Sequence, residues 1–131
     1  MIVLDTSALI AIVAKEPERE SFLAVVEAGG ECFVSALTLY ETRLVALSRL
    51  GDAGLKEVND HIEAIAVTVV SFDNAQSELA FQAYRQFGKG FHAGAALNIC
   101  DCAAYALAIA LSAPLLFKGN DFAATDVIAA P

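Results

Sequence analysis

The sequence lacks a hydrophobic segment long enough to cross a membrane, and it lacks the features of a signal peptide. Although 57% of the 131 residues are hydrophobic, no stretch reaches the ~20 apolar residues that a spanning helix needs. No basic residues precede the apolar run at the N-terminus, and Asp5 interrupts that run. We therefore expect a cytoplasmic protein with no membrane partner.

Cysteine and histidine are scarce, which argues against a zinc site. The three cysteines, Cys32, Cys100 and Cys102, form no Cys-x-x-Cys pair, and the chain has only two histidines. An odd number of cysteines suits a reducing compartment, in agreement with a cytoplasmic location.

Basic residues are also few. Eight Lys and Arg stand against 16 Asp and Glu, which gives a net charge of −8. This balance argues against binding nucleic acid through bulk positive charge. It fits either a basic protein partner or acidic side chains gathered around a cation.

Short apolar runs separated by helical patterns predict a parallel sheet. No repeat, low-complexity segment or linker divides the chain, so we expect one α/β domain over residues 1–131. Its sheet should have four to five short strands covered by helices on both faces. In the helix that follows the second strand, we expect Tyr40, Leu44 and Leu47 to form the apolar stripe and Gly51 to end the helix. The predicted strands are residues 2–4, 32–34, 67–70 and 115–117.

Four acidic residues stand where a predicted strand ends or a helix begins. Asp5 ends the first strand, Glu41 and Asp101 lie in the opening turns of helices, and Asp121 follows the last strand. These positions share the rim at the carboxyl ends of the strands, where open α/β sheets bind ligands. Because converging carboxylates repel one another, a hard cation such as Mg²⁺ would be needed to hold them together. Such a cation can activate water and stabilise charge on a phosphodiester.

Each of these acids also has a purely structural explanation. Asp5 can cap the following helix, and Thr38 with Glu41 matches a capping box. Asp101 suits the positive end of a helix dipole, and Asp121 suits a turn. A single site at this rim explains the four acids more simply than four independent structural roles.

Other polar residues give weaker signals. His92 lies in a glycine-rich loop that has no phosphate-loop pattern, and we expect it at the surface. Lys118 either meets a phosphate or offsets nearby acids, while Arg85 and Lys89 either contact an RNA backbone or are simply solvated. No basic neighbour marks Cys100 as a nucleophile.

Four segments, taken in order, resemble the PIN-domain nucleases and in particular the VapC toxins of bacterial toxin–antitoxin pairs. The resemblance spans the whole chain, and the ordered set of segments is far more specific than the Asp-Thr-Ser motif alone. The segments are Val3–Leu9, Ser35–Glu41, Leu97–Ala108 and Leu115–Phe122.

The resemblance implies an endoribonuclease that depends on Mg²⁺ or Mn²⁺ and cleaves structured RNA such as tRNA or rRNA. Asp5, Glu41 and Asp101 would form the acidic triad that binds the metal, and Asp121 would be the fourth acid. The resemblance also implies a VapB-type antitoxin that inserts a C-terminal segment, often with a basic side chain, into the acidic groove. It further implies a toxin homodimer and a larger complex with the antitoxin.

Two positions depart from this family pattern. Cys100 stands where many relatives have glycine, and Lys118–Asp121 stands where many have Thr-x-Asp. The fourth acidic role is therefore open to Asp121 or Asn120.

Three other functions compete with the ribonuclease hypothesis. Haloacid-dehalogenase-type enzymes need a second Asp where this chain has Ser7, and receiver domains need an acid pair that is missing. A non-catalytic PIN-like module that binds RNA or protein remains the alternative, and the presence of all four acids disfavours it.

Overall fold

The computed structural model describes all 131 residues and contains a parallel four-stranded sheet in the order β3-β2-β1-β4. The predicted α/β class and parallel sheet are therefore confirmed. No helix is long and apolar enough to cross a membrane. The strands are β1 (Ile2–Leu4), β2 (Cys32–Ser35), β3 (Thr68–Val70) and β4 (Leu115–Leu116). The helices are α1 (Thr6–Val13), α2 (Arg19–Ala28), α3 (Ala36–Ile65), α4 (Asn74–Phe87) and α5 (Ile99–Leu111).

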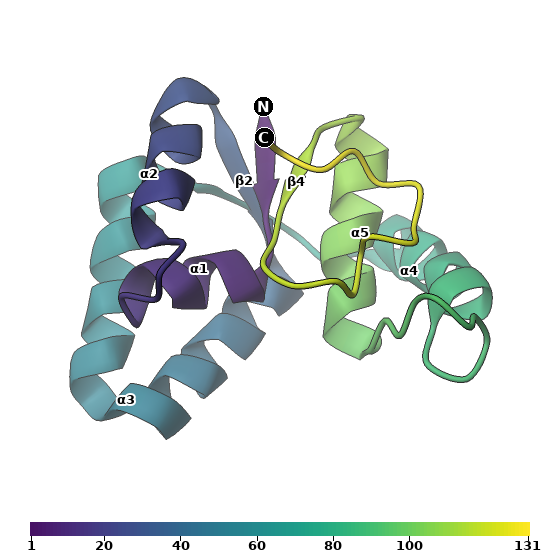
Figure 1. The fold of residues 1–131 in the computed structure, drawn as a ribbon, viewed down its shortest axis with the longest axis horizontal. Helices are drawn as coiled ribbons and strands as arrows, with labels where there is room; N and C mark the ends of the chain where they lie inside the picture. The colour runs from purple at the N-terminus through teal and green to yellow at the C-terminus, as the bar shows by residue number, and fades with distance from the viewer.

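Strand β1 lies inside the sheet and contributes to two separate cores. Successive side chains of a strand point to opposite faces, so Ile2 and Leu4 pack in one core while Val3 packs in the other. Helices α1, α2 and α3 lie on one side of the sheet, and α4 and α5 lie on the other (Figure 1). The prediction that helices cover both faces is confirmed.

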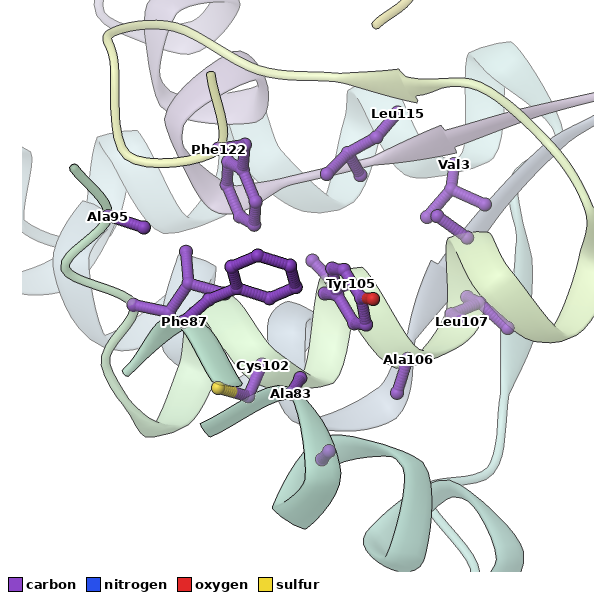
Figure 2. Close-up of a cluster of buried hydrophobic side chains, with 14 of the residues drawn as sticks. Val3, Ala83, Phe87, Ala95, Cys102, Tyr105, Ala106, Leu107, Leu115 and Phe122 are labelled. Atoms are coloured by element: carbon purple, nitrogen blue, oxygen red, sulfur yellow. The ribbon is translucent and has the colours of Figure 1, made fainter. Parts of the chain in front are cut away.

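The core beneath α4 and α5 is built around aromatic side chains. Tyr105 of α5 lies with its ring centroid 5.8 Å from that of Phe87, which ends α4. Phe122, from the segment after β4, points into the same core (Figure 2). Eight consecutive residues of α5, Asp101–Ala108, are buried, because the many alanines let neighbouring backbones approach closely.

The strand order places a topological switch point beside β1. The chain runs from β1 through β2 to β3 in one direction, and β4 then pairs on the opposite side of β1. The register pairs Leu4 with Leu116, so β1 and β4 end side by side. In open α/β sheets this crevice at the carboxyl ends is where ligands bind.

Helix α3 bends sharply at Gly51 (Figure 1). The backbone of Gly51 has φ 70° and ψ −162°, which is not helical, so two helical segments meet there. The predicted end of a helix at Gly51 is confirmed.

The prediction of an inward-facing apolar stripe along the first half of α3 is wrong. Tyr40, Leu44 and Leu47 are 58%, 48% and 47% exposed. The helix instead turns Leu39 inward together with two threonines and an alanine, and the threonines meet Thr6 of α1. The buried residues of this half are Thr38, Leu39, Thr42 and Ala46.

Gly51→Ala is expected to lower the free energy of unfolding by about 1–3 kcal/mol, because only glycine adopts these angles readily. A Cβ added at Gly51 meets nothing within 4 Å, so backbone strain alone causes the effect. Urea unfolding measures it, with the exposed Ser48→Ala as a control that should change stability by no more than about 0.5 kcal/mol. An alanine variant as stable as the wild type would show that the bend relaxes without cost.

Candidate active site

A pocket of about 410 Å³ opens at the carboxyl ends of β1 and β4, and we call it the acidic pocket. It brings together all four acids that the sequence singled out. The sequence did not single out Glu16 or Arg49, which also line it. The pocket is lined by Asp5, Thr6, Ser7, Ile10, Glu16, Glu41, Val45, Arg49, Asp101, Lys118, Gly119, Asp121 and Phe122.

Asp5 uses one carboxylate oxygen for structure and leaves the other free. Its Oδ2 accepts hydrogen bonds from the backbone N–H of Ser7 at 3.0 Å and from the Ser7 hydroxyl at 2.6 Å, so Asp5 caps α1. Its Oδ1 is buried and has no hydrogen-bond partner. Burial raises the pKa of Asp5, against the lowering effect of the Ser7 hydrogen bonds, and the charge of Glu41 raises it further. The structural and functional explanations of Asp5 are thus compatible.

Ser7 joins the two strand ends that form the pocket. Its hydroxyl donates to Asp5 Oδ2 and accepts a hydrogen bond from the backbone N–H of Lys118 at 2.9 Å. This bond links residues 111 positions apart in the chain. Ser7 therefore fixes which oxygen of Asp5 stays free, a role that no local sequence pattern indicates.

Asp101 is held at the start of α5 by a capping box. Asp101 Oδ2 accepts from the Asn98 N–H at 2.9 Å, and Asn98 Oδ1 accepts from the Asp101 N–H at 2.8 Å. Burial raises the pKa of Asp101 to about 7; the hydrogen bond from Asn98 opposes the rise, and the charges of Asp5, Asp121 and Glu41 add to it. The four carboxylates are therefore close enough to disturb one another.

Glu41 is not part of a capping box. Helix α3 begins at Ala36, and Ser35 is its N-cap, accepting from the Leu37 N–H at 3.3 Å. The predicted pairing of Thr38 with Glu41 is wrong, because α3 starts a turn earlier than that motif requires. Glu41 instead lies half-buried on the wall of the acidic pocket.

Cys100 lies beside this wall and is not an activated nucleophile. Burial, followed by the charge of Glu41, raises the pKa of the Cys100 thiol to about 11. The thiol therefore stays protonated at neutral pH, as expected from the lack of a basic neighbour.

Asp121 lines the pocket, and its neighbour Phe122 is held in the core. Phe122 is 2% exposed and its ring centroid lies 5.1 Å from that of Phe117. Asn120 does not line the pocket, and its carbonyl oxygen accepts from the Ala123 N–H at 3.1 Å. Of the two residues open for the fourth acidic position, the structure places Asp121 at the site.

Lys118 and Arg49 are the two basic residues of the acidic pocket. The Lys118 ammonium lies 3.3 Å from Glu16 Oε2 and 3.0 Å from Glu18 Oε2, so it offsets local acids. Arg49 forms no ion pair in the structure. The sequence could have indicated Arg49 as a pocket residue, because it lies eight residues after Glu41 and therefore on the same face of α3.

The other candidates lie outside the acidic pocket. Arg85 and Lys89 do not line it. His92 is exposed, and its Nδ1 accepts from the N–H groups of Gly94 and Ala95 at 2.9 and 3.1 Å. His92 therefore shapes its own loop, in agreement with the surface position expected for it.

The residues of the acidic pocket fit a divalent cation. No three His, Cys, Asp or Glu side chains stand close enough together to enclose a metal as they are. However, the buried and unpartnered Oδ1 of Asp5 needs a partner, because an unsatisfied buried acceptor is costly. An all-carboxylate donor set suits Mg²⁺ or Mn²⁺.

Comparisons with known proteins agree with this geometry. The PIN domain family model matches residues 2–128. The chain is 43% identical to VapC ribonuclease Mb0640 of Mycobacterium bovis over 125 residues, which covers 95% of each protein. It is 42% identical to Ribonuclease VapC of Mycolicibacterium smegmatis over 127 residues, covering 97% of this chain and 98% of the relative.

Solved structures share the fold at lower sequence identity. The Mycobacterium tuberculosis toxin VapC20, described as cleaving the sarcin–ricin loop, superposes with a TM-score of 0.80 at 18% identity and full coverage of both chains. VapBC2 of Rickettsia felis, solved with a fragment of its promoter DNA, gives a TM-score of 0.71 at 15% identity, covering 98% of this chain and 96% of the other.

Proposed function

The chain belongs to the PIN-domain family, among its VapC ribonucleases, and on this premise we propose that it is a toxin that cleaves RNA in its acidic pocket with a bound divalent cation. One observation carries the proposal most directly. Four carboxylates from four separate parts of the chain line one pocket, and the buried Oδ1 of Asp5 has no partner there.

Asp5, Glu41, Asp101 and Asp121 would hold the cation, with Mg²⁺ or Mn²⁺ as its identity. When bound, such a cation supplies Lewis acidity that stabilises charge on the phosphodiester and makes water more acidic. The rest of the chain orients these ligands. Ser7 donates to Oδ2 of Asp5, which leaves Oδ1 as the free oxygen, and the Asn98 N–H holds Oδ2 of Asp101 in place.

The raised pKa of Asp101 makes metal binding depend on pH. Because that pKa is raised to about 7, a substantial fraction of Asp101 is protonated near neutral pH without metal. Cation binding should therefore release a proton and tighten as the pH rises through 7.

The partner is a VapB-type antitoxin that inserts a basic segment into the acidic pocket. The net charge of −8 supports this, since it favours a basic partner. A VapBC complex with the same fold supports it as well. We extend the proposal to a toxin homodimer, to a larger complex with the antitoxin and to action in the cytoplasm.

The substrate is structured RNA, either tRNA or rRNA. The name of the VapC20 neighbour, a sarcin–ricin loop cleaving toxin, supports the rRNA choice by analogy. Sequencing the ends of the cleaved RNA fragments identifies the target.

The test is cleavage of total cellular RNA by the purified protein with Mg²⁺, with Mn²⁺ and with EDTA. We expect discrete fragments with either metal and none with EDTA, because the carboxylates alone cannot neutralise the phosphodiester. Added antitoxin should suppress the fragments. RNA binding without cleavage under every metal condition would instead support the non-catalytic PIN-like module.

A further inference from the structure

We infer that Arg49 binds a phosphate of the RNA substrate at the outer end of the acidic pocket, an assignment that rests on the proposed ribonuclease function. The chain must bring a polyanion to a pocket that is itself acidic. With a net charge of −8, the protein as a whole repels RNA. Local cations at the pocket must therefore supply part of the attraction.

Only two of the eight Lys and Arg residues line the acidic pocket. The ammonium of Lys118 is already engaged by Glu16 at 3.3 Å and by Glu18 at 3.0 Å. Its positive charge is largely offset before any substrate arrives. Lys118 is thus a poor candidate for binding RNA.

Arg49 has neither an ion pair nor a side-chain hydrogen bond, and it is exposed. By contrast, Arg43 of the same helix donates to the side chain of Asn59 at 3.3 Å and lies outside the pocket. An arginine that lines a pocket with four carboxylates and pairs with none of them keeps all five of its N–H donors available. A planar guanidinium matches two phosphate oxygens at once.

The position of Arg49 also fits a neighbouring phosphate better than the one that is cleaved. Glu41, Val45 and Arg49 line the pocket from successive turns of α3. Arg49 therefore stands about 12 Å from Glu41 along the helix axis. This separation assigns Arg49 to binding the RNA strand and leaves the reacting phosphate to the cation that the carboxylates would hold.

The test measures RNA affinity in an Asp5→Asn background, in which the RNA should stay uncut. Fluorescein-labelled total cellular RNA is titrated in Mg²⁺ at several KCl concentrations. Adding Arg49→Ala should weaken binding about tenfold, as expected for loss of a charged hydrogen bond. The slope of log affinity against log salt should become shallower by roughly 0.7–0.9, the value for one phosphate contact. Arg49→Lys should keep most of the slope.

Arg43→Ala is the matched control, because it removes the same charge from the same helix outside the pocket. An effect of Arg49→Ala no larger than that of Arg43→Ala overturns the inference. So does a loss of affinity with an unchanged salt slope, since that indicates a contact to a base.

Cleavage in the wild-type background separates this inference from the proposed function. Arg49→Ala should lower kcat/KM about tenfold, mainly through KM, while Arg43→Ala should not. If the wild type cleaves RNA and both arginine variants match it, only the role of Arg49 is wrong. If the wild type cleaves no RNA with any metal, the proposed function itself fails.

Discussion

Asp5→Asn is expected to reduce RNA cleavage by about 1,000-fold or more. The substitution replaces a buried carboxylate of the acidic pocket, whose Oδ1 has no hydrogen-bond partner, with a neutral amide. Losing a metal ligand removes several kcal/mol of charge stabilisation, and each 1.36 kcal/mol is tenfold in rate. Initial rates on total RNA in Mg²⁺ measure the loss.

Asp52→Asn is the control for this experiment. Asp52 is exposed on α3, outside the pocket, and the same change there should leave the rate within about twofold. Thermal unfolding of both variants checks that they fold. Asparagine can still accept the capping hydrogen bond from Ser7, so we expect Asp5→Asn to fold. Undiminished cleavage by this variant would place the active site elsewhere.

Asp101→Asn is expected to stabilise the metal-free protein by an amount that grows with pH. The pKa of Asp101 is about 7 in the folded protein against the ordinary value of 3.8. Between these values the folded state binds a proton that the unfolded state has released. The free energy of unfolding of the wild type therefore falls as the pH rises through this range, by on the order of a few kcal/mol. Asparagine does not titrate and avoids this loss.

Urea unfolding in EDTA at pH 5 and pH 8 measures the effect. The advantage of Asp101→Asn over the wild type should be larger at pH 8, and Asp52→Asn should show no such advantage at either pH. Excess Mg²⁺ or Mn²⁺ should reverse the order at pH 8, because ligand binding stabilises only the wild type. A variant less stable than the wild type at pH 8 in EDTA would show that the ionised carboxylate stabilises the fold.

The parts of the fold that could be predicted from the sequence are those with a strong local signal. Strand β1 was evident because a buried parallel strand is a continuous apolar run. Helix α4, from Asn74 to Phe87, likewise has a strong local signal, since a glycine follows its last residue directly. The shared rim at the strand ends then followed from topology, and it was enough to bring the four acids to one pocket.

The orientation of α3 could not be predicted, because two of the four buried residues in its first half are the threonines Thr38 and Thr42. The hydroxyls of Thr6 and Thr42 lie 3.0 Å apart, and they lie 3.2 and 2.8 Å from the Thr38 carbonyl oxygen. The hydroxyls of Thr6 and Thr42 are thus satisfied by each other and by the Thr38 carbonyl inside the protein. A hydrophobic periodicity analysis instead selects the larger side chains of Tyr40 and Leu44, which the structure leaves exposed.

The supporting contacts of the site were also beyond local sequence patterns. Ser7 meets the N–H of Lys118, and Lys118 meets Glu16 across 102 positions of the chain. Such pairs depend on how β1 and β4 align. The acids were recognisable because carboxylates at strand ends are chemically unusual, whereas a serine or a surface arginine is not.

The most direct test of the central claim is a Mn²⁺ titration followed by electron paramagnetic resonance, which reports bound metal without requiring activity. Our account predicts one or more Mn²⁺ ions bound by the wild type, binding that tightens from pH 6 to pH 8, and loss of most affinity in both Asp5→Asn and Asp101→Asn. Asp52→Asn should bind like the wild type. Mn²⁺ binding that survives both pocket substitutions would contradict the account, because the metal would then be held outside the acidic pocket.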